Sequence, residues 1–228
     1  MNPIFASPKF IASLDIDAQN CFTPLCPMEL PVEEGHLIVS ELNAQAQFAS
    51  LRLGSKEAHS PSAVWVASLE KPVLSPVMGG GSNVDVHWPS HAVPGTLGFQ
   101  LLKGLPAVTD YDFFVWKGVE LDLHPYGSCF HDLNEKLSTG MIEFLKQRQI
   151  LSVIVGGLAT DYCVKATVLQ LLKAKFKVIL NLGACRGVAK ETTAKAIEEM
   201  KNQGVLFIQC ANEMVTVHGA TNALGWVI

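Results

Sequence analysis

A cysteine and two charged residues occupy positions from which they could act together as a nucleophilic centre. Cys163 lies in the first turn of a helical pattern, just after an apolar run that ends at Gly156 and Gly157. A thiol there faces unpaired backbone N–H groups and the positive end of the helix dipole, which favour a thiolate and a developing oxyanion. Asp17 and Lys117 each follow another apolar run, so a carboxylate could accept the thiol proton and an ammonium could stabilise the thiolate. Each residue alone is more often structural, but the three together predict catalysis by a cysteine nucleophile.

A second group of residues has the spacing of a metal site. Glu57 and His59 are two residues apart in "KEAHSP", so in an extended segment both side chains point to the same side and could chelate one ion. His91 could supply a third ligand and leave open coordination positions, as a catalytic or substrate-binding ion requires. His87 is the nearest alternative to His91. A solvated glutamate with two loop histidines is the ordinary interpretation of the same pattern.

These residues must be positioned by a sheet, because six apolar runs are typical of buried strands. Amphipathic segments lie between several of them, and this alternation predicts βαβ units and a mostly parallel sheet. The predicted strands are the run from Val153, "FIASLDI" (10–16), "AVWVAS" (63–68), "DFFVW" (112–116), "KVILNL" (177–182) and "VLFIQC" (205–210). The predicted helices cover about 37–51, 133–147, 160–174 and 190–202.

Ligands of parallel sheets bind outside the carboxyl ends of the strands. This rule places Asp17, the region after Ser68, Lys117 and Cys163 at the same edge of the sheet. The stretch 72–98 is irregular and rich in Gly, Pro, Ser and His, and a loop of that length in a compact domain is usually functional or disordered. Its three consecutive glycines are not a phosphate-binding loop, because no GK[ST] sequence follows them.

The composition predicts one α/β domain over residues 1–228. The chain has 228 residues, of which 49% are hydrophobic and 17% charged, so it can bury one substantial core. A net charge of −4 argues against nucleic-acid and membrane-surface partners. No apolar run is long enough to cross a bilayer and no basic-then-apolar leader is present, so we expect a cytoplasmic protein. The six cysteines lack CxxC spacing, which argues against a thiolate zinc site.

Together these residues resemble the nicotinamidase branch of the isochorismatase-like cysteine hydrolases. The resemblance is ordered along most of the chain and is closest at "GLATDYCVKATVLQLL". The other matching segments are "DAQNCF", "EAHSP", "HWPSHAVPGT", "WKG" followed by "YGSCF", and "ACRGV".

The resemblance implies a three-layer α/β/α fold with a doubly wound, six-stranded, mostly parallel sheet. It implies that Cys163 attacks the carboxamide carbon of nicotinamide, with Asp17 as general base and Lys117 as electrostatic partner, to give nicotinate and ammonia through a thioester. It also implies a cis peptide before Ala159, with the backbone N–H groups of Ala159 and Cys163 as the oxyanion hole. The expected role is NAD salvage, and pyrazinamide is the expected second substrate.

By the same resemblance, a divalent ion, Zn, Mn or Fe, would bind the pyridine nitrogen, and aromatic walls would hold the ring. The implied metal ligands are Glu57, His59 and His91, and the implied substrate-binding residues are Phe22, Trp88 and Tyr126. Some members have a further histidine ligand a few residues after the D-x-H pair, which has no counterpart in "HSPSAVW".

The chain departs from the family pattern at several positions. Glu57 stands where Asp is usual, Cys21 replaces the second acidic residue of the opening motif, and Ala92 replaces the cysteine after the loop histidine. Gly183 stands where an aspartate is common, and "YGSCF" is one residue longer than its counterpart.

Two other functions fit parts of the pattern. An amidohydrolase for another small amide, carbamoyl or ureido compound would keep the three residues of the nucleophilic centre but would usually lack the metal ligands. A binding or redox-sensing module that kept the fold would use the other cysteines. A monomer and a homo-oligomer are equally compatible with the sequence.

Overall fold

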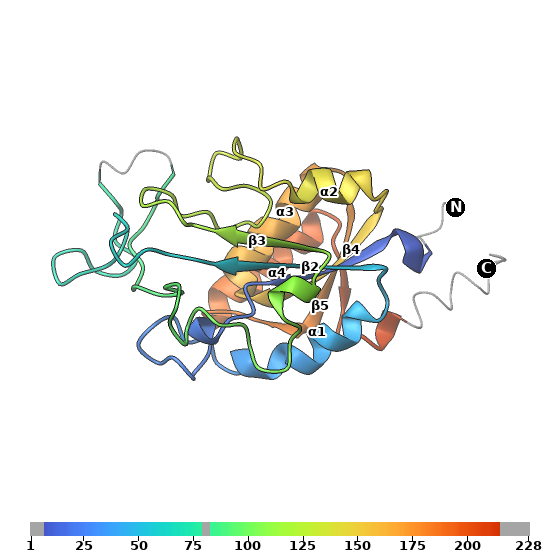
Figure 1. Ribbon diagram of the computed structural model, residues 1–228, viewed down its shortest axis with the longest axis horizontal. Coiled ribbons are helices and arrows are strands. Elements are labelled where there is room, and N and C mark those ends of the chain that lie inside the picture. Colours follow the sequence, from blue (N-terminus) through green and yellow to red (C-terminus); the bar gives the residue numbers. More distant parts are fainter. Residues whose placement is uncertain (1–6, 79–82, 215–228) are drawn as a thin grey trace.

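A single parallel sheet forms the centre of the protein, as a computed structural model shows for residues 7–78 and 83–214 (Figure 1). Residues 79–82, which include the three glycines of the predicted loop, lie outside the described residues. The strand order is β3-β2-β1-β4-β5-β6, and every neighbouring pair is parallel. The strands are β1 (Ile11–Ile16), β2 (Leu51–Glu57), β3 (Phe113–Lys117), β4 (Ser152–Leu158), β5 (Lys177–Arg186) and β6 (Leu206–Ile208). The predicted six-stranded α/β fold is confirmed, and all of its strands are parallel.

Helices cover both faces of this sheet. Alternate strand residues point to opposite faces, so neighbours such as Val153 and Ile154 enter different hydrophobic clusters. The helices α2 (Met141–Gln147), α3 (Lys165–Lys173) and α4 (Lys190–Asn202) pack on the face of Val153, and α1 (Val39–Ala46) packs on the other. This is the predicted three-layer arrangement. None of the helices in the described ranges is both long and apolar enough to cross a membrane.

Some predicted helix boundaries need correction. The predicted helix 190–202 coincides with α4, but only the second half of 133–147 is helical. Before α2 the chain turns, because the Asp132 carboxylate accepts the backbone N–H groups of Lys136 and Leu137 at 2.9 and 2.8 Å. Hydrogen bonds from such a side chain compete with those of a helix.

The predicted strand 63–68 is wrong, and so is the placement of the region after Ser68 at the sheet edge. The second strand is β2, and 63–68 contributes only an isolated bridge between Val66 and Trp88. The sequence of β2, "LRLGSKE", lacks an apolar run, because its buried second half carries Ser55, Lys56 and Glu57. These polar residues are buried because they meet polar or aromatic partners, which the sequence pattern does not reveal.

The carboxyl ends of four neighbouring strands bring the candidate residues together. Asp17 follows β1, Glu57 ends β2, Lys117 ends β3, and Cys163 lies five residues after β4. Glu57 and Lys117 are direct register partners in the β2–β3 pair. The chain from 58 to 112 joins β2 to β3 without an α-helix in its described part, and it carries His59, Trp88 and His91 to the same edge.

Candidate active site

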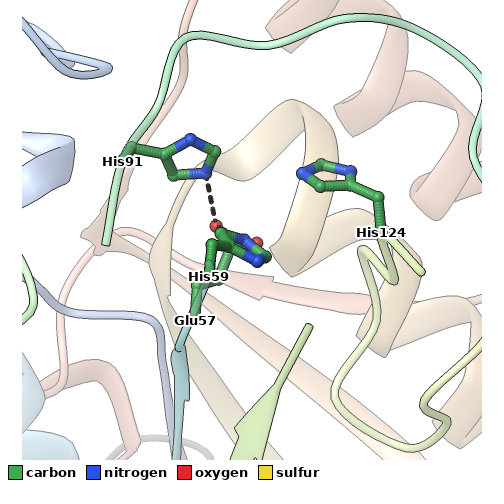
Figure 2. A group of neighbouring side chains, drawn as sticks. All are labelled: Glu57, His59, His91 and His124. Carbon is green, nitrogen blue, oxygen red and sulfur yellow. Dashed lines mark hydrogen bonds and ion pairs between the residues drawn. The ribbon is translucent and has the colours of Figure 1, made fainter. Parts of the chain in front are cut away.

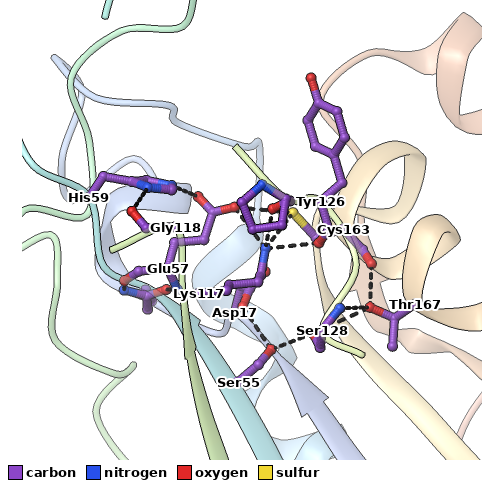
Figure 3. A network of polar contacts seen from close by, with 12 residues as sticks. Asp17, Ser55, Glu57, His59, Lys117, Gly118, Tyr126, Ser128, Cys163 and Thr167 are labelled. Atoms are coloured by element: carbon purple, nitrogen blue, oxygen red, sulfur yellow. Dashed lines mark hydrogen bonds and ion pairs between the residues drawn. The ribbon is translucent and has the colours of Figure 1, made fainter. Parts of the chain in front are cut away.

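The Lys117 ammonium lies at the centre of a buried polar cluster (Figure 3). Its Nζ is 2.9 Å from Asp17 Oδ2, 2.9 Å from Glu57 Oε1 and 3.4 Å from Cys163 Sγ. It also donates to the carbonyl oxygen of Tyr126 at 2.8 Å. Asp17 and Lys117 have no exposed surface, and Cys163 is 5% exposed. The three residues predicted to form the nucleophilic centre are therefore in direct contact.

Glu57 joins this cluster, which the sequence did not indicate. One carboxylate oxygen, Oε1, contacts Lys117 and lies 3.4 Å from Cys163 Sγ. The other, Oε2, is 3.0 Å from His59 Nε2 and 2.8 Å from His91 Nε2. One carboxylate thus lies between the thiol and the predicted metal ligands.

The charges in this cluster set its protonation. Burial raises the pKa of the Cys163 thiol well above its usual value, and the attraction of Lys117 does not offset burial and the nearby carboxylates. Burial also raises the pKa of Asp17, although Lys117 opposes it. Burial alone would raise the pKa of Glu57, but Lys117 and His59 hold it well below its usual range. Burial would lower the pKa of Lys117, but Asp17, Cys163 and Glu57 keep it well above its usual value. The resting cluster therefore holds a neutral thiol, an ammonium and an ionised Glu57.

A chain of hydrogen-bonded, buried hydroxyl groups leads to the Asp17 carboxylate (Figure 3). Ser55 Oγ donates to Asp17 Oδ1 at 2.7 Å, and Ser128 Oγ donates to Ser55 Oγ at 2.8 Å. Thr167 Oγ1 uses its proton on the carbonyl oxygen of Cys163 at 2.8 Å and accepts the backbone N–H of Ser128 at 2.9 Å. Each serine hydroxyl donates in the direction of the carboxylate, which fixes the orientation of Asp17 relative to the backbone of Cys163.

The backbone before Cys163 has the form that the resemblance implies. The peptide bond between Leu158 and Ala159 is cis. One wide π-type turn, Thr160–Val164, follows and leads into α3, so Cys163 lies just before the regular helix instead of in its first turn. Asp161 accepts the backbone N–H of Val188 at 3.0 Å and so ties this turn to the segment before α4.

Three histidines converge with Glu57 beside the thiol (Figure 2). One ligand atom from each of Glu57, His59, His91 and His124 lies within 4.8 Å of the others, and all four residues are buried. The structure thus brings the three predicted ligands together and adds His124, which sequence reasoning missed. His124 follows Lys117 by seven residues in the loop after β3, so its position near the same strand end was the available signal. His87, the alternative to His91, is not in the cluster, and its Nδ1 lies 3.1 Å from the carbonyl oxygen of Trp65.

The hydrogen bonds of this cluster fit a bound cation. His59 Nδ1 lies 2.9 Å from the carbonyl oxygen of Gly118, and His91 Nδ1 lies 2.7 Å from that of Pro89. A carbonyl oxygen only accepts, so both Nδ1 atoms carry the proton. Burial lowers the pKa of His59, so its Nε2 presents a lone pair to a carboxylate oxygen at 3.0 Å. Two facing acceptors need a cation between them, and imidazole and carboxylate donors suit a divalent ion. Asp17, Glu57 and Cys163 are also close together, but the Lys117 ammonium already lies among them.

A pocket with aromatic walls opens onto both clusters. Its lining includes Cys163, Ala159 and Glu57. The three predicted substrate-binding residues, Phe22, Trp88 and Tyr126, all line it, together with Tyr162, which was not predicted. Trp88 Nε1 donates to the Tyr126 hydroxyl at 3.1 Å, which holds two of these walls together. The aromatic lining suits a flat aromatic ligand.

Comparisons with known proteins agree with this geometry. A family model described as "Isochorismatase domain" matches residues 86–212, more than half of the chain. The nicotinamidase of Acinetobacter baylyi is 33% identical over 132 residues, which cover 58% of this chain and 61% of that relative. The aligned region therefore spans less than two thirds of the relative's length.

Two solved structures extend the likeness over most of the fold. The Acinetobacter baumanii nicotinamidase and pyrazinamidase has a TM-score of 0.81 and 26% identity, with 92% of this chain and 100% of that chain covered. The Pyrococcus horikoshii pyrazinamidase, solved in complex with zinc, has a TM-score of 0.68 and 26% identity, with 88% and 99% covered. The family model matches only residues 86–212, so it does not include Asp17, Glu57 and His59. The evidence that these three residues belong to the site comes from the structure.

Proposed function

The chain belongs to the isochorismatase family, and from this membership and the geometry of its site we propose that it is an amidohydrolase that converts nicotinamide to nicotinate and ammonia. The observation that carries the proposal is the contact of the Cys163 thiol with Lys117 and of Lys117 with Asp17, at the base of an aromatic pocket. Pyrazinamide, another small heteroaromatic carboxamide, is the expected second substrate.

The first step joins the Cys163 sulfur to the carboxamide carbon. Because burial raises the pKa of the thiol, the proton must leave as the sulfur attacks, and Asp17 receives it. The raised pKa of Asp17, also caused by burial, makes its carboxylate a stronger base. Lys117 remains charged and offsets the negative charge that develops on the sulfur.

The remaining steps return the site to its starting state. As the C–S bond forms, the carbonyl oxygen becomes an oxyanion, which we assign to the backbone N–H groups of Ala159 and Cys163. The C–N bond then breaks, and the proton held by Asp17 passes to the leaving nitrogen, so ammonia departs and a thioester remains. Asp17 next takes a proton from water, whose oxygen attacks the thioester carbon. The C–S bond breaks, the sulfur regains its proton, and nicotinate is released.

The pocket supplies the binding energy and orientation for a flat ring. Phe22 and Trp88 would face the pyridine ring from two sides, and Tyr126 would line the pocket next to Trp88. Glu57, His59 and His91 would hold a divalent ion, Zn, Mn or Fe, and the solved pyrazinamidase relative with zinc supports such an ion. When bound, the ion supplies a Lewis-acidic position for the ring nitrogen.

The biological setting follows from this reaction. A small amide is the proposed partner, with no nucleic acid or membrane, and we propose NAD salvage as the role of the reaction and the cytoplasm as its location. Both a monomer and a homo-oligomer remain compatible with the site, since all of its proposed residues come from one chain.

Ammonia release from nicotinamide by the purified protein tests the proposal. We expect Cys163→Ala to abolish release, whereas Cys129→Ala, which removes another buried thiol, should keep it. Benzamide, which lacks the ring nitrogen, should be a much poorer substrate. Hydrolysis of a carbamoyl or ureido compound but not of nicotinamide would replace this function with the other amidohydrolase function. Full activity of Cys163→Ala would overturn the mechanism.

A further inference from the structure

We propose that His124 is a fourth protein ligand of the divalent-ion site, so that the ion is held by three imidazoles and the Glu57 carboxylate. This inference deepens the proposed function and rests on its metal site. The three ligands implied by the family resemblance do not include this histidine, which lies in the loop after β3.

The first argument is the lack of any other partner for this ring. His124 is 2% exposed, and neither Nδ1 nor Nε2 has a hydrogen-bond partner within residues 7–78 and 83–214. The two neighbouring ligands each direct Nδ1 to a carbonyl oxygen, and so does His87. Leaving a buried imidazole without a partner costs free energy, and an ion on one ring nitrogen would provide one.

The second argument is the direction of the ring. Figure 2 shows His124 on the opposite side from His91, with Glu57 and His59 entering from below, and the His124 ring points toward the space between these side chains. Aromatic rings hold it there: it stacks on His59 with a centroid distance of 5.2 Å and packs edgewise on Trp65 at 4.4 Å and Tyr126 at 5.1 Å. These contacts fix the ring plane without using either nitrogen.

The third argument is the chemistry of the resulting set. Three imidazole nitrogens and one carboxylate oxygen form a four-ligand set that suits Zn²⁺, which can expand to five ligands when another group binds. Two ligand atoms on one tetrahedral zinc are about 3.4 Å apart, given metal bonds of about 2.0–2.1 Å. In the structure the four ligand atoms lie within 4.8 Å of one another, and two of the pairs are 2.8 and 3.0 Å apart, so binding an ion requires only small movements of these side chains. The ion would then link the end of β2, the segment of His91 and the loop that follows Lys117.

Zinc affinity tests the proposal, measured by competition with a chromophoric chelator. Loss of a residue that supports a metal ligand lowers metal affinity about 10–100-fold. We expect His124→Ala and His124→Gln to lower the affinity for Zn²⁺ by at least that much. The matched control is His87→Ala, which removes another buried histidine that contacts Trp65, and it should stay within about 3-fold of the unsubstituted protein. Unchanged zinc affinity in folded His124 variants would overturn the proposal.

A measurement on the unsubstituted protein covers the case in which the variants fail to fold. With Co²⁺ as the probe, each bound imidazole gives one strongly shifted, exchangeable ring N–H signal in the proton NMR spectrum. Three such signals are expected if His124 binds, and two would refute its role. Neither readout depends on turnover. Three signals without nicotinamide hydrolysis would reject the proposed function alone, and hydrolysis with two signals would reject this inference alone.

Discussion

Replacing Lys117 with methionine should destabilise the protein strongly, because this ammonium is the only cation that contacts both Asp17 and Glu57 among the described residues. Each carboxylate lies 2.9 Å from Nζ, and at an effective dielectric constant of about 20 each contact has a gross attraction of about 6 kcal/mol. The cost of burying the ammonium cancels much of this attraction. Removing one partner of a buried ion pair costs about 3–5 kcal/mol, because the remaining charge is left uncompensated. We expect a loss of that size at pH 7 for Lys117→Met.

The pH dependence of this loss is a sharper test than its size. In the unsubstituted protein burial alone would raise the pKa of Glu57, but Lys117 contributes most to holding it below its usual value. A lowered folded-state pKa gives stability above the unfolded value of about 4.3 that is lost as the pH falls. Without Lys117 the pKa of Glu57 rises, because burial is then opposed mainly by His59 and His91, so the variant loses less stability than the unsubstituted protein as the pH falls. The difference between the two proteins should therefore shrink on acidification from pH 7 towards pH 4.5.

Urea unfolding followed by circular dichroism at several pH values measures this difference. Lys56→Met is the matched control, because Lys56 is also a buried lysine near the end of β2. Its Nζ lies 3.5 Å from the ring centroid of Phe99 and 4.7 Å from that of Trp116, a contact worth about 0.5–2 kcal/mol. Equal losses for the two variants, or a Lys117→Met loss that does not vary with pH, would refute the electrostatic reasoning.

Two further substitutions test the support of the site. Ser55→Ala removes the 2.7 Å donor to Asp17, and the loss of this hydrogen bond to a charged group should lower the free energy of unfolding by about 1.5–3 kcal/mol. Because that hydrogen bond lowers the pKa of Asp17, the acid limb of the kcat/KM profile should move to higher pH, and an unchanged profile would contradict this role. Gly118→Ala would place a Cβ 2.2 Å from the His59 ring at a φ of +72°, and should lower zinc affinity by at least about 10-fold in a chelator competition. Gly204→Ala, at φ +86° with open space around it, should leave zinc affinity unchanged, so equal effects of the two glycine variants would reject the steric argument.

The sequence predicted the helices and strands correctly where their apolar residues follow a regular pattern. The strand before Cys163 and the helix 190–202 have regular apolar patterns, and both lie where the patterns predict. Patterning failed at β2, because its buried residues are the polar ones that the site requires. The predicted strand 63–68 is apolar for a different reason, since Trp65 and its neighbours form a small separate cluster around the loops.

The candidate site was predictable to the extent that its residues follow strands. The rule that parallel strands present their carboxyl ends at one edge brought Asp17, Lys117 and Cys163 together. The spacing of Glu57, His59 and His91 indicated the first three proposed metal ligands, and the family resemblance implies the same three. His124 was missed because neither its spacing from the other histidines nor a known motif marks it. The position of Glu57 in contact with the thiol was also missed, since the length of a side chain does not reveal which of two neighbouring clusters it will reach.

That position of Glu57 means that the proposed nucleophile and the proposed metal ligands form one electrostatic unit. Oε1 contacts Lys117 and lies near the Cys163 sulfur, while Oε2 faces two imidazole nitrogens. A cation on the histidine side would draw negative charge from this carboxylate, and less of that charge would then act on the thiol. The family pattern has aspartate here, and the glutamate adds one methylene between the strand and the carboxylate. A change in the ion or in Glu57 should therefore alter the reactivity of Cys163 as well as substrate binding, which separate clusters would not require.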